Sequence, residues 1–302
     1  MNDIKGIVRS ASDKIEGLYD AVQALLFGGA TTQRALCSEF LCNCGISPES
    51  RMTKMEYEKI RDVICDSHTN KCLYWYDMEL KIESLADRIA AVESLYLDFD
   101  LKLPHIDCID DSMIECARID ISEWADDAYV AANNVFVAIA AGLDILAKIA
   151  YEVSHVEEYD FASYKRMKSD DILFKQGLPI DDKFKKCGMV FSEIPSIRLI
   201  EAFRNEYVHN SSWSYRATVY EATDKAGNLL PRYMMFPDYD ERGFFIKSGT
   251  RGHFYSQGNK INEKMPDIIV PVLRAIENTV EAMIEFCYDK AKAMSATVTK
   301  LG

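Results

Sequence analysis

The sequence of 302 residues lacks the short motifs that mark several large enzyme classes. It contains no glycine-rich loop suited to cradling a phosphate, no GxSxG nucleophile elbow and no HExxH pair. P-loop nucleotide hydrolysis, α/β-hydrolase chemistry and HExxH-type zinc proteolysis are therefore not expected. Internal repeats and low-complexity runs are absent as well, which argues against a repeat architecture.

Cysteine is present, but not in a pattern that identifies disulfides or zinc. The nine cysteines are scattered along the chain, and their number is odd. The polar, helix-like start of the chain does not resemble a secretory signal peptide, so we expect reduced thiols in a cytoplasmic protein. The most crowded region does not have the spacing of two CxxC knuckles, so we expect no metal site and no cofactor. It contains Cys37, Cys42, Cys44, Cys65, His68 and Cys72.

Long uninterrupted hydrophobic runs are also missing. The most apolar stretch, residues 129–151, includes Asn133, Asn134, Asp144 and Lys148. Hydrocarbon tolerates such side chains poorly. We therefore expect this stretch to be a buried helix of a soluble protein, with no membrane as a partner.

Positive charge is scarce, since 35 basic and 48 acidic residues give a formal net charge of −13. Residues 71–160 hold 20 acidic and 6 basic side chains, whereas residues 161–210 hold 9 basic and 7 acidic ones. Global acidity argues against non-specific coating of nucleic acid, but it leaves room for a local basic surface. In the second segment Lys165, Arg166, Lys185 and Lys186 are the candidates for binding an anionic substrate.

Apolar residues recur at intervals of three and four along most of the chain, which predicts a mainly α-helical fold. The expected helices lie at residues 15–26, 54–65, 73–97, 123–150 after a cap at Ser122, 195–209, and from Pro266 or Pro271 onward. Each of the last three has a single apolar stripe that needs a partner. We therefore expect these three helices to pack as one bundle.

The pattern changes between residues 215 and 247, where β-branched and aromatic residues dominate. Segments 215–223, 229–236 and 244–247 are separated by turn-forming residues, which predicts a small antiparallel hairpin or three-stranded sheet. The segment 98–111, which contains Pro104, is expected to be a connector. We expect an N-terminal helical region at residues 1–103 and a helical bundle at residues 104–302, with a β insertion at about 215–257.

The segment from Ile200 to Asn210 carries the residues best suited to chemistry. On a helix Asn205 and His209 are four residues apart and share a face, and Arg204 lies beside Asn205. A histidine whose pKa is near neutrality can transfer a proton. An arginine can hold a phosphate and stabilise its added negative charge in a transition state.

With Arg204, the adjacent Asn205 and a histidine at His209, residues 122–292 resemble a HEPN domain. The resemblance implies a helical bundle in which two subunits join their motifs at a dimer interface to form a metal-independent ribonuclease site. Arg204 and His209 would be catalytic, with Asn205 and Asp144 organising them. It also implies an RNA substrate, a homodimer, and a toxin or defence effector restrained by an antitoxin or another regulatory protein.

Other interpretations fit the same residues. Arg204 and His209 could cap the helix or pair with Glu201 and Glu206, and Asp144 could pair with Lys148. A HEPN-like module without activity would dimerise or bind a protein or nucleotide, which the net charge of −13 favours. The intact motif favours the enzyme. A third alternative is an unrelated helical scaffold with a chance motif.

Overall fold

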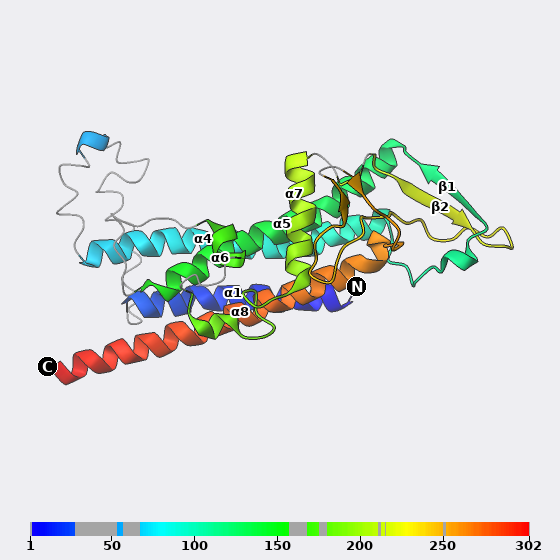
Figure 1. Ribbon diagram of the computed structural model, residues 1–302. Helices are drawn as coiled ribbons and strands as arrows, with labels where there is room; N and C mark the ends of the chain where they lie inside the picture. The colour runs from blue at the N-terminus through cyan, green and yellow to red at the C-terminus, as the bar shows by residue number, and fades with distance from the viewer. Residues whose placement is uncertain are drawn as a thin grey trace. The chain divides into compact units, whose positions relative to one another are not determined.

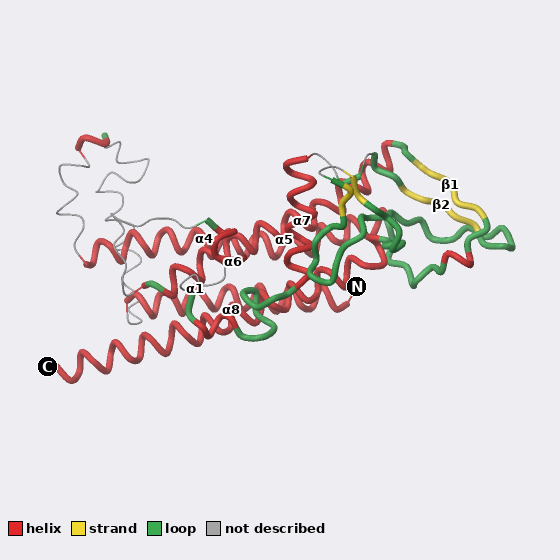
Figure 2. Tube along the Cα trace, viewed as in Figure 1, coloured by secondary structure: helices red, strands yellow, loops and turns green. Residues whose placement is uncertain are grey.

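The computed structural model describes residues 2–27, 53–56, 67–156, 168–174, 180–210, 213–214, 216–249 and 252–301 of the chain. Across these residues helices predominate and the strands are short (Figure 1 and Figure 2). The predicted fold class, mainly α with a small antiparallel β insertion, is therefore confirmed.

The longer helices are α1 at Asn2–Phe27, α4 at Ser67–Lys102, α5 at Glu123–Ser154, α7 at Pro195–Asn210 and α8 at Ile261–Leu301. Each covers a predicted helix, and α1, α4 and α8 extend beyond the predicted bounds. The helix predicted at residues 54–65 lies outside the described residues, apart from a helical turn at 54–56. Residues 98–102, which were expected to belong to a connector, are the last residues of α4.

Two short helical elements lie between α5 and α7, where a loop was expected. They are α6 at Ser169–Phe174 and the 3-10 helix η3 at Asp182–Lys185. Each buries a single apolar side chain, Ile172 in α6 and Phe184 in η3. The expectation of a loop was wrong because one buried residue per element produces no periodic pattern.

The chain forms two compact units, and each is assembled from three separate segments. Unit 1 comprises Met1–Ser12, Asp87–Leu143 and Cys187–Ile276, and it contains the motif helix α7. Unit 2 comprises Asp13–Ala86, Asp144–Lys186 and Glu277–Gly302. The domain boundary predicted at residues 103 and 104 stays a prediction.

Unit 2 is held together by side chains of α1, α4 and α8. The ring centroids of Tyr19 and Trp75 lie 4.7 Å apart, and the Tyr19 hydroxyl donates to Glu79 at 2.8 Å. Lys14 of α1 forms an ion pair with Glu277 of α8 at 3.0 Å. These polar contacts border buried apolar stripes, which supply most of the stabilisation.

In unit 1 the motif helix α7 packs on α5 through aromatic rings. Phe136 of α5 and Phe203 of α7 stack with centroids 4.3 Å apart and ring planes inclined by 6°. Trp213, Phe236 and Phe245 surround the Phe203 ring at centroid distances of 5.6, 5.5 and 5.0 Å. Phe203 is fully buried, and burial of a side chain of this size contributes about 1.5–3 kcal/mol.

The helix α5 is the one described helix that is long and apolar enough to span a membrane by length and composition. Of its most apolar 18-residue stretch, 67% is buried within the protein. The stripe that was predicted to face the core, from Ala128 to Ala150, is fully buried. The expected cytoplasmic location and the absence of a membrane partner stay predictions.

The first strand pair joins β1 at Cys116–Asp120 to β2 at Val219–Thr223 in antiparallel order. β2 lies within a predicted strand, whereas β1 was not predicted. Nearly all β1 side chains are exposed, so its sequence has no alternation of apolar and polar residues. Residues 229–236, which were predicted to be a strand, contribute isolated bridges instead, such as Tyr233 to Tyr220.

A second strand pair, β3 at Lys247–Ser248 and β4 at Gly252–His253, forms a hairpin next to α7. The turn that precedes it touches the start of α7. Gly243 has a φ of 86°, and a Cβ at this position would lie 2.1 Å from the carbonyl oxygen of Pro195. Only glycine combines a positive φ with such a close backbone contact at low cost.

The last helix begins earlier than predicted, at Ile261, and it contains both Pro266 and Pro271. A proline cannot donate to the carbonyl four residues earlier, so Pro266 leaves the Asn262 carbonyl without its helical donor. Nδ1 of His105 lies 3.1 Å from that oxygen. The predicted start at a proline was wrong because a contact from outside the helix replaces the lost hydrogen bond.

Gly243→Ala is expected to lower the free energy of unfolding by more than about 2 kcal/mol, because the new Cβ would overlap Pro195. Urea denaturation followed by circular dichroism measures the change. Gly227→Ala is the matched control, since its φ is 82° but nothing lies within 4 Å of an added Cβ. We expect a loss of about 1 kcal/mol there. If the free energy of unfolding falls equally in the two variants, the close contact between Gly243 and Pro195 does not constrain the turn.

Candidate functional site

The motif residues occupy the last two turns of α7 (Figure 1). The helix begins at Pro195, where the missing N–H of proline leaves no helical hydrogen bond unmade. Ile200 and Phe203 are buried on one side of the helix, while Asn205 and His209 are exposed on the other. Because the packing of Phe203 fixes the rotation of α7 about its own axis, the motif faces solvent.

Arg204 lies beside Asn205 with its guanidinium partly exposed. Its Nη1 donates to Oδ1 of Asn205 at 2.9 Å, and the same nitrogen lies 3.9 Å from Oε2 of Glu201. The pairing with Glu201 is therefore present, but at a long distance. The Arg204 side chain keeps 29% of its surface exposed. A guanidinium in this position can meet an anion that arrives from solvent.

His209 is exposed in the final turn of α7. It lies one turn beyond Asn205 on the same face, as the spacing predicted. The alternative ion pair between His209 and Glu206 is not found among the described residues. The Glu206 carboxylate instead contacts Asn210, Lys247 and His253. An exposed imidazole can bind an anionic group and transfer a proton to or from it.

Just beyond the motif, Trp213 is buried and anchored by hydrogen bonds. Its backbone N–H donates to the Tyr129 hydroxyl at 3.1 Å, and its indole Nε1 donates to Oδ1 of Asn133 at 2.8 Å. The Tyr255 hydroxyl donates to the Trp213 carbonyl at 2.9 Å. Satisfied buried networks of this kind specify one conformation, so they hold Trp213 in one position.

A buried polar cluster that was not predicted lies on the side of α7 that faces the hairpin. Oε2 of Glu206 accepts from Nδ2 of Asn210 at 2.9 Å, and Oε1 pairs with Lys247 of β3. Oε1 also lies 3.8 Å from Nε2 of His253 in β4, and the Glu206 and His253 side chains expose only 9% and 8% of their surface. Spacing could not have identified this cluster, because its members come from three separate elements.

These contacts change the protonation of both buried groups. Burial by itself raises the pKa of Glu206, but hydrogen bonds from Lys247 and Asn210 outweigh it and bring the pKa below its ordinary 4.5. Burial lowers the pKa of His253 below 6.5; the Glu206 charge opposes this shift and the Lys247 charge adds to it. Near pH 7 the cluster therefore contains an ionised Glu206 and a neutral His253.

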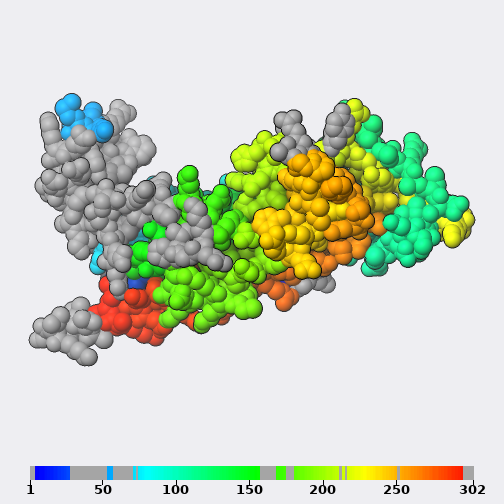
Figure 3. Space-filling model, viewed as in Figure 1, coloured from blue at the N-terminus to red at the C-terminus, as the bar shows by residue number. Residues whose placement is uncertain are grey.

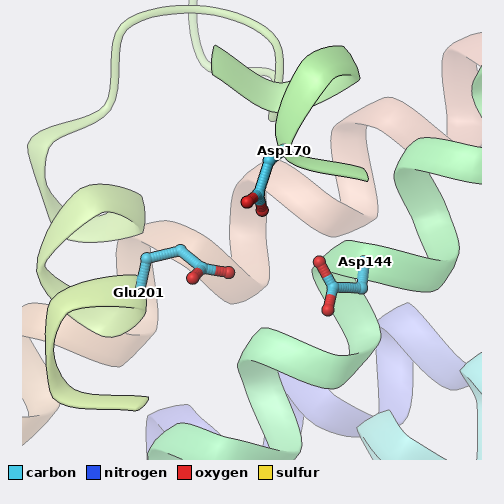
Figure 4. Close-up of side chains that lie close together, drawn as sticks. All are labelled: Asp144, Asp170 and Glu201. Atoms are coloured by element: carbon cyan, nitrogen blue, oxygen red, sulfur yellow. The ribbon is translucent and has the colours of Figure 1, made fainter. Parts of the chain in front are cut away.

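Asp144, which was predicted to help organise the motif, is half-buried on α5 and belongs to unit 2. Figure 4 shows it with Asp170 of α6, and carboxylate oxygens of the two residues lie within 4.8 Å of each other. Carboxylate oxygens are ligands for hard cations such as Mg²⁺. Glu201, also drawn in Figure 4, belongs to unit 1 through α7. A role of Asp144 beside Arg204 stays a prediction.

Two of the four basic residues that were predicted to contact substrate fall within the described chain. Lys185 ends η3 and pairs with Asp182 at 3.0 Å, and Lys186 follows it; both lysines are exposed. They belong to unit 2. Lys165 and Arg166 lie outside the described residues. A contact between these four side chains and substrate stays a prediction.

One cysteine departs from the prediction of reduced thiols, since Cys72 is disulfide-bonded. Pairing depends on the separation of Cα atoms in the folded chain, which scattered sequence spacings do not reveal. Burial raises the pKa of the free Cys287 thiol to about 12. The other candidate zinc ligands fall outside the described residues or side chains: Cys37, Cys42, Cys44, Cys65 and His68.

Comparison of the chain with protein families, with curated proteins and with solved structures found no match in any of the three. We therefore infer the function from the geometry of α7 and from the chemistry of its exposed residues.

The Glu206 cluster is expected to make the protein less stable in acid. In an upper window just below pH 6.5, His253 takes up a proton in the unfolded chain but not in the folded protein, because its folded pKa is lowered. In a lower window just below pH 4.5, Glu206 takes up a proton in the unfolded chain but not in the folded protein, for the same reason. The free energy of unfolding should therefore fall as the pH falls through each window. Urea denaturation at a series of pH values measures the slope, and His253→Gln should flatten the upper window.

Glu206→Gln should flatten the lower window in the same way. Glu241→Gln is the control for this measurement, because Glu241 is an exposed carboxylate in the neighbouring turn. The control should leave both slopes unchanged. A His253→Gln variant with the wild-type slope just below pH 6.5 would contradict the account of the cluster.

Proposed function

We propose that this protein is a metal-independent endoribonuclease, similar to HEPN ribonucleases, in which Arg204 and His209 act on the phosphodiester. The observation that supports the proposal is that Asn205 and His209 are exposed, and Arg204 partly exposed, on a helix whose opposite side is packed into the core. A site of this kind holds the helix backbone that carries its reactive groups at a fixed position before substrate arrives. Such preorganisation is the main source of electrostatic catalysis.

In the proposed reaction His209 accepts the proton of the ribose 2′-hydroxyl next to the scissile phosphate. The 2′-oxygen then bonds to phosphorus, and the bond from phosphorus to the 5′-oxygen of the next nucleotide breaks. That oxygen takes a proton from an imidazolium. The products are a 2′,3′-cyclic phosphate and a 5′-hydroxyl. Arg204 binds the phosphate and stabilises its increased charge in the transition state.

The reaction needs a base for the 2′-hydroxyl and an acid for the leaving oxygen. Each copy of the motif supplies one imidazole. Two copies related by a two-fold axis would supply both, so we propose a homodimer with the α7 helices near that axis. An active ribonuclease in the cytoplasm would damage cellular RNA. We therefore propose a toxin or defence effector that an antitoxin or another regulatory protein restrains.

A non-catalytic HEPN-like module is the second candidate. It is favoured by the contact between Arg204 and Glu201 and by the net charge of −13, which opposes binding of nucleic acid. In that case the exposed face of α7 would bind a protein, a nucleotide or a second copy of the chain without breaking a bond. The two candidates differ in whether RNA is cleaved.

His209→Ala is expected to lower the rate of RNA cleavage by about 10²–10⁴-fold, because the proton-transfer group is lost. Its folding should be unchanged, since an exposed side chain at a helix end contributes little packing. Gel assays with structured and unstructured RNA measure the rate, and product analysis should find 2′,3′-cyclic phosphate or 3′-phosphate ends. Chelation with EDTA should leave wild-type cleavage unchanged.

Arg204→Ala should reduce cleavage as well, and it should also weaken RNA binding because the guanidinium meets phosphate in the ground state. Arg242→Ala is the matched control, since Arg242 is an exposed arginine in the turn that precedes the hairpin, in the same unit. It should cleave as wild type does. Wild-type protein that cuts no RNA, or a His209→Ala variant that cuts at the wild-type rate, would favour the non-catalytic module.

The composite site predicts a dimer in solution. Light scattering at high micromolar concentration should give twice the mass of the 34.3 kDa chain. A monomer under these conditions, with no partner present, would contradict the composite site.

A further inference from the structure

The strand β1 forms a free edge of the first strand pair. β2 pairs with it on one side, and Figure 1 shows no other described strand beside it. Cys116, Ala117, Arg118 and Ile119 are all exposed. In Figure 3 the blue-green surface of residues near 115 is open on the visible side. A bare strand edge carries unpaired N–H and C=O groups, so it is a template for pairing with another strand.

The backbone of Ile119 points toward this free edge. The N–H of Tyr220 donates to the Tyr233 carbonyl at 2.8 Å, and the N–H of Tyr233 donates to the Tyr220 carbonyl at 3.1 Å. Both backbone groups of Tyr220 therefore point away from β1, although Tyr220 lies opposite Ile119 in the register. In an antiparallel ladder such a pair exchanges no hydrogen bonds, so the N–H and C=O of Ile119 point away from β2. Among the described residues, no backbone group from outside the strand pair bonds to them.

One face of the sheet carries an apolar row that reaches the edge. The rings of Tyr220 and Tyr233 stack with centroids 5.2 Å apart, and Tyr233 belongs to a buried cluster with Ile106 and Ile109. Residues opposite each other in a ladder share a face, so Ile119 continues this row. Its side chain keeps 59% of its surface exposed. The row thus ends in an apolar side chain that has no neighbour on the outer side among the described strands.

The other face carries a row of alternating charges. Arg232 forms an ion pair with Glu221 of β2, and Glu221 lies opposite Arg118 of β1. Asp120 is two residues beyond Arg118, so the two side chains lie on the same face of the strand. The edge of β1 therefore presents one positive and one negative side chain next to each other.

This arrangement is complementary to itself. When two β1 strands pair in antiparallel order about Ile119, Arg118 of each copy lies opposite Asp120 of the other. The charges across the joined sheet then alternate from Arg232 through Glu221 and Arg118 to Asp120 of the second copy. On the opposite face the two Ile119 side chains meet at the centre. Opposite charges and apolar pairs at facing positions both stabilise an antiparallel ladder.

Neighbouring registers lack this complementarity. A pair centred on Arg118 would place two arginines opposite each other, and a pair centred on Asp120 would place two aspartates there. Like charges at facing positions destabilise a ladder. A pair centred on Ala117 would place Arg118 opposite Cys116 and would form no ion pair. The edge therefore selects a second copy of itself in a single register.

We propose that β1 pairs with β1 of a second copy of the chain, in antiparallel order about Ile119, on a two-fold axis. The pairing supplies a contact of the proposed homodimer and rests on that part of the proposed function, but it needs no RNA cleavage. β1 is followed directly by α5, and Tyr129 in the first two turns of α5 packs on Tyr207 of α7 with ring centroids 6.1 Å apart. The proposed contact is thus connected to the motif end of α7 within unit 1.

The test uses charge reversal and mixing. Arg118→Glu and Asp120→Lys each place like charges opposite one another twice in the dimer. Each variant alone should dissociate with a dissociation constant about 5- to 100-fold above that of wild type. An equimolar mixture of the two should associate as wild type does, because each altered side chain then meets the opposite charge. Sedimentation equilibrium of the full chain measures the dissociation constant.

Lys225→Glu is the matched control for charge, since Lys225 is exposed in the turn after β2. It should associate as wild type does. Thermal unfolding checks the fold of Asp120→Lys, because Asp120 accepts from the backbone N–H of Ser122 at 2.9 Å. If that variant does not fold, Ile119→Asp replaces it, since it places two carboxylates at the axis and should weaken association. Leu229→Asp, at a side chain 80% exposed elsewhere in unit 1, should not.

The proposal is overturned if wild type is a monomer at high micromolar concentration, if Arg118→Glu and Ile119→Asp associate as wild type does, or if mixing the two folded charge variants does not restore association. A wild-type dimer that Arg118→Glu leaves intact would remove the strand pair and leave the composite site at α7. Wild type that pairs through β1 but cuts no RNA would remove the ribonuclease and leave the strand pair.

Discussion

The stack of Phe203 on Phe136 determines which side of α7 is available for chemistry. The Phe203 ring is enclosed by aromatic side chains from α5, from the hairpin and from the chain beyond α7, so the helix cannot rotate about its axis without opening the core. As a consequence, Asn205 and His209 are held in solvent, and Arg204 lies beside Asn205. The exposure of the motif is thus a result of packing on the opposite side of the same helix.

A second consequence concerns the hairpin, which uses the same helix as its support. Gly243 lets the turn approach Pro195, and the Glu206 pair with Lys247 ties β3 to the C-terminal half of α7. The hairpin is therefore held in place by contacts at both ends of α7.

Much of the helical framework could be predicted from the sequence, because the stripes of α5 and α7 repeat with the helical period and both helices have clear ends. The spacing of Asn205 and His209 likewise predicted their common face. Other features depend on contacts between distant parts of the chain. β1 exists because β2 pairs with it, α8 continues through Pro266 because His105 meets the exposed carbonyl, and Glu206 becomes part of a buried cluster through two strands that follow it. No local pattern carries that information.

We propose that the ribose 2′-hydroxyl attacks the phosphate with help from the α7 motif. The most direct measurement uses an RNA that the wild-type protein cuts at a mapped position, and compares it with the same RNA carrying a single 2′-deoxy nucleotide on the 5′ side of that position. If the 2′-hydroxyl is the nucleophile, cleavage at this bond disappears while cleavage at other bonds continues. Cleavage of the 2′-deoxy bond at an unchanged rate would contradict it.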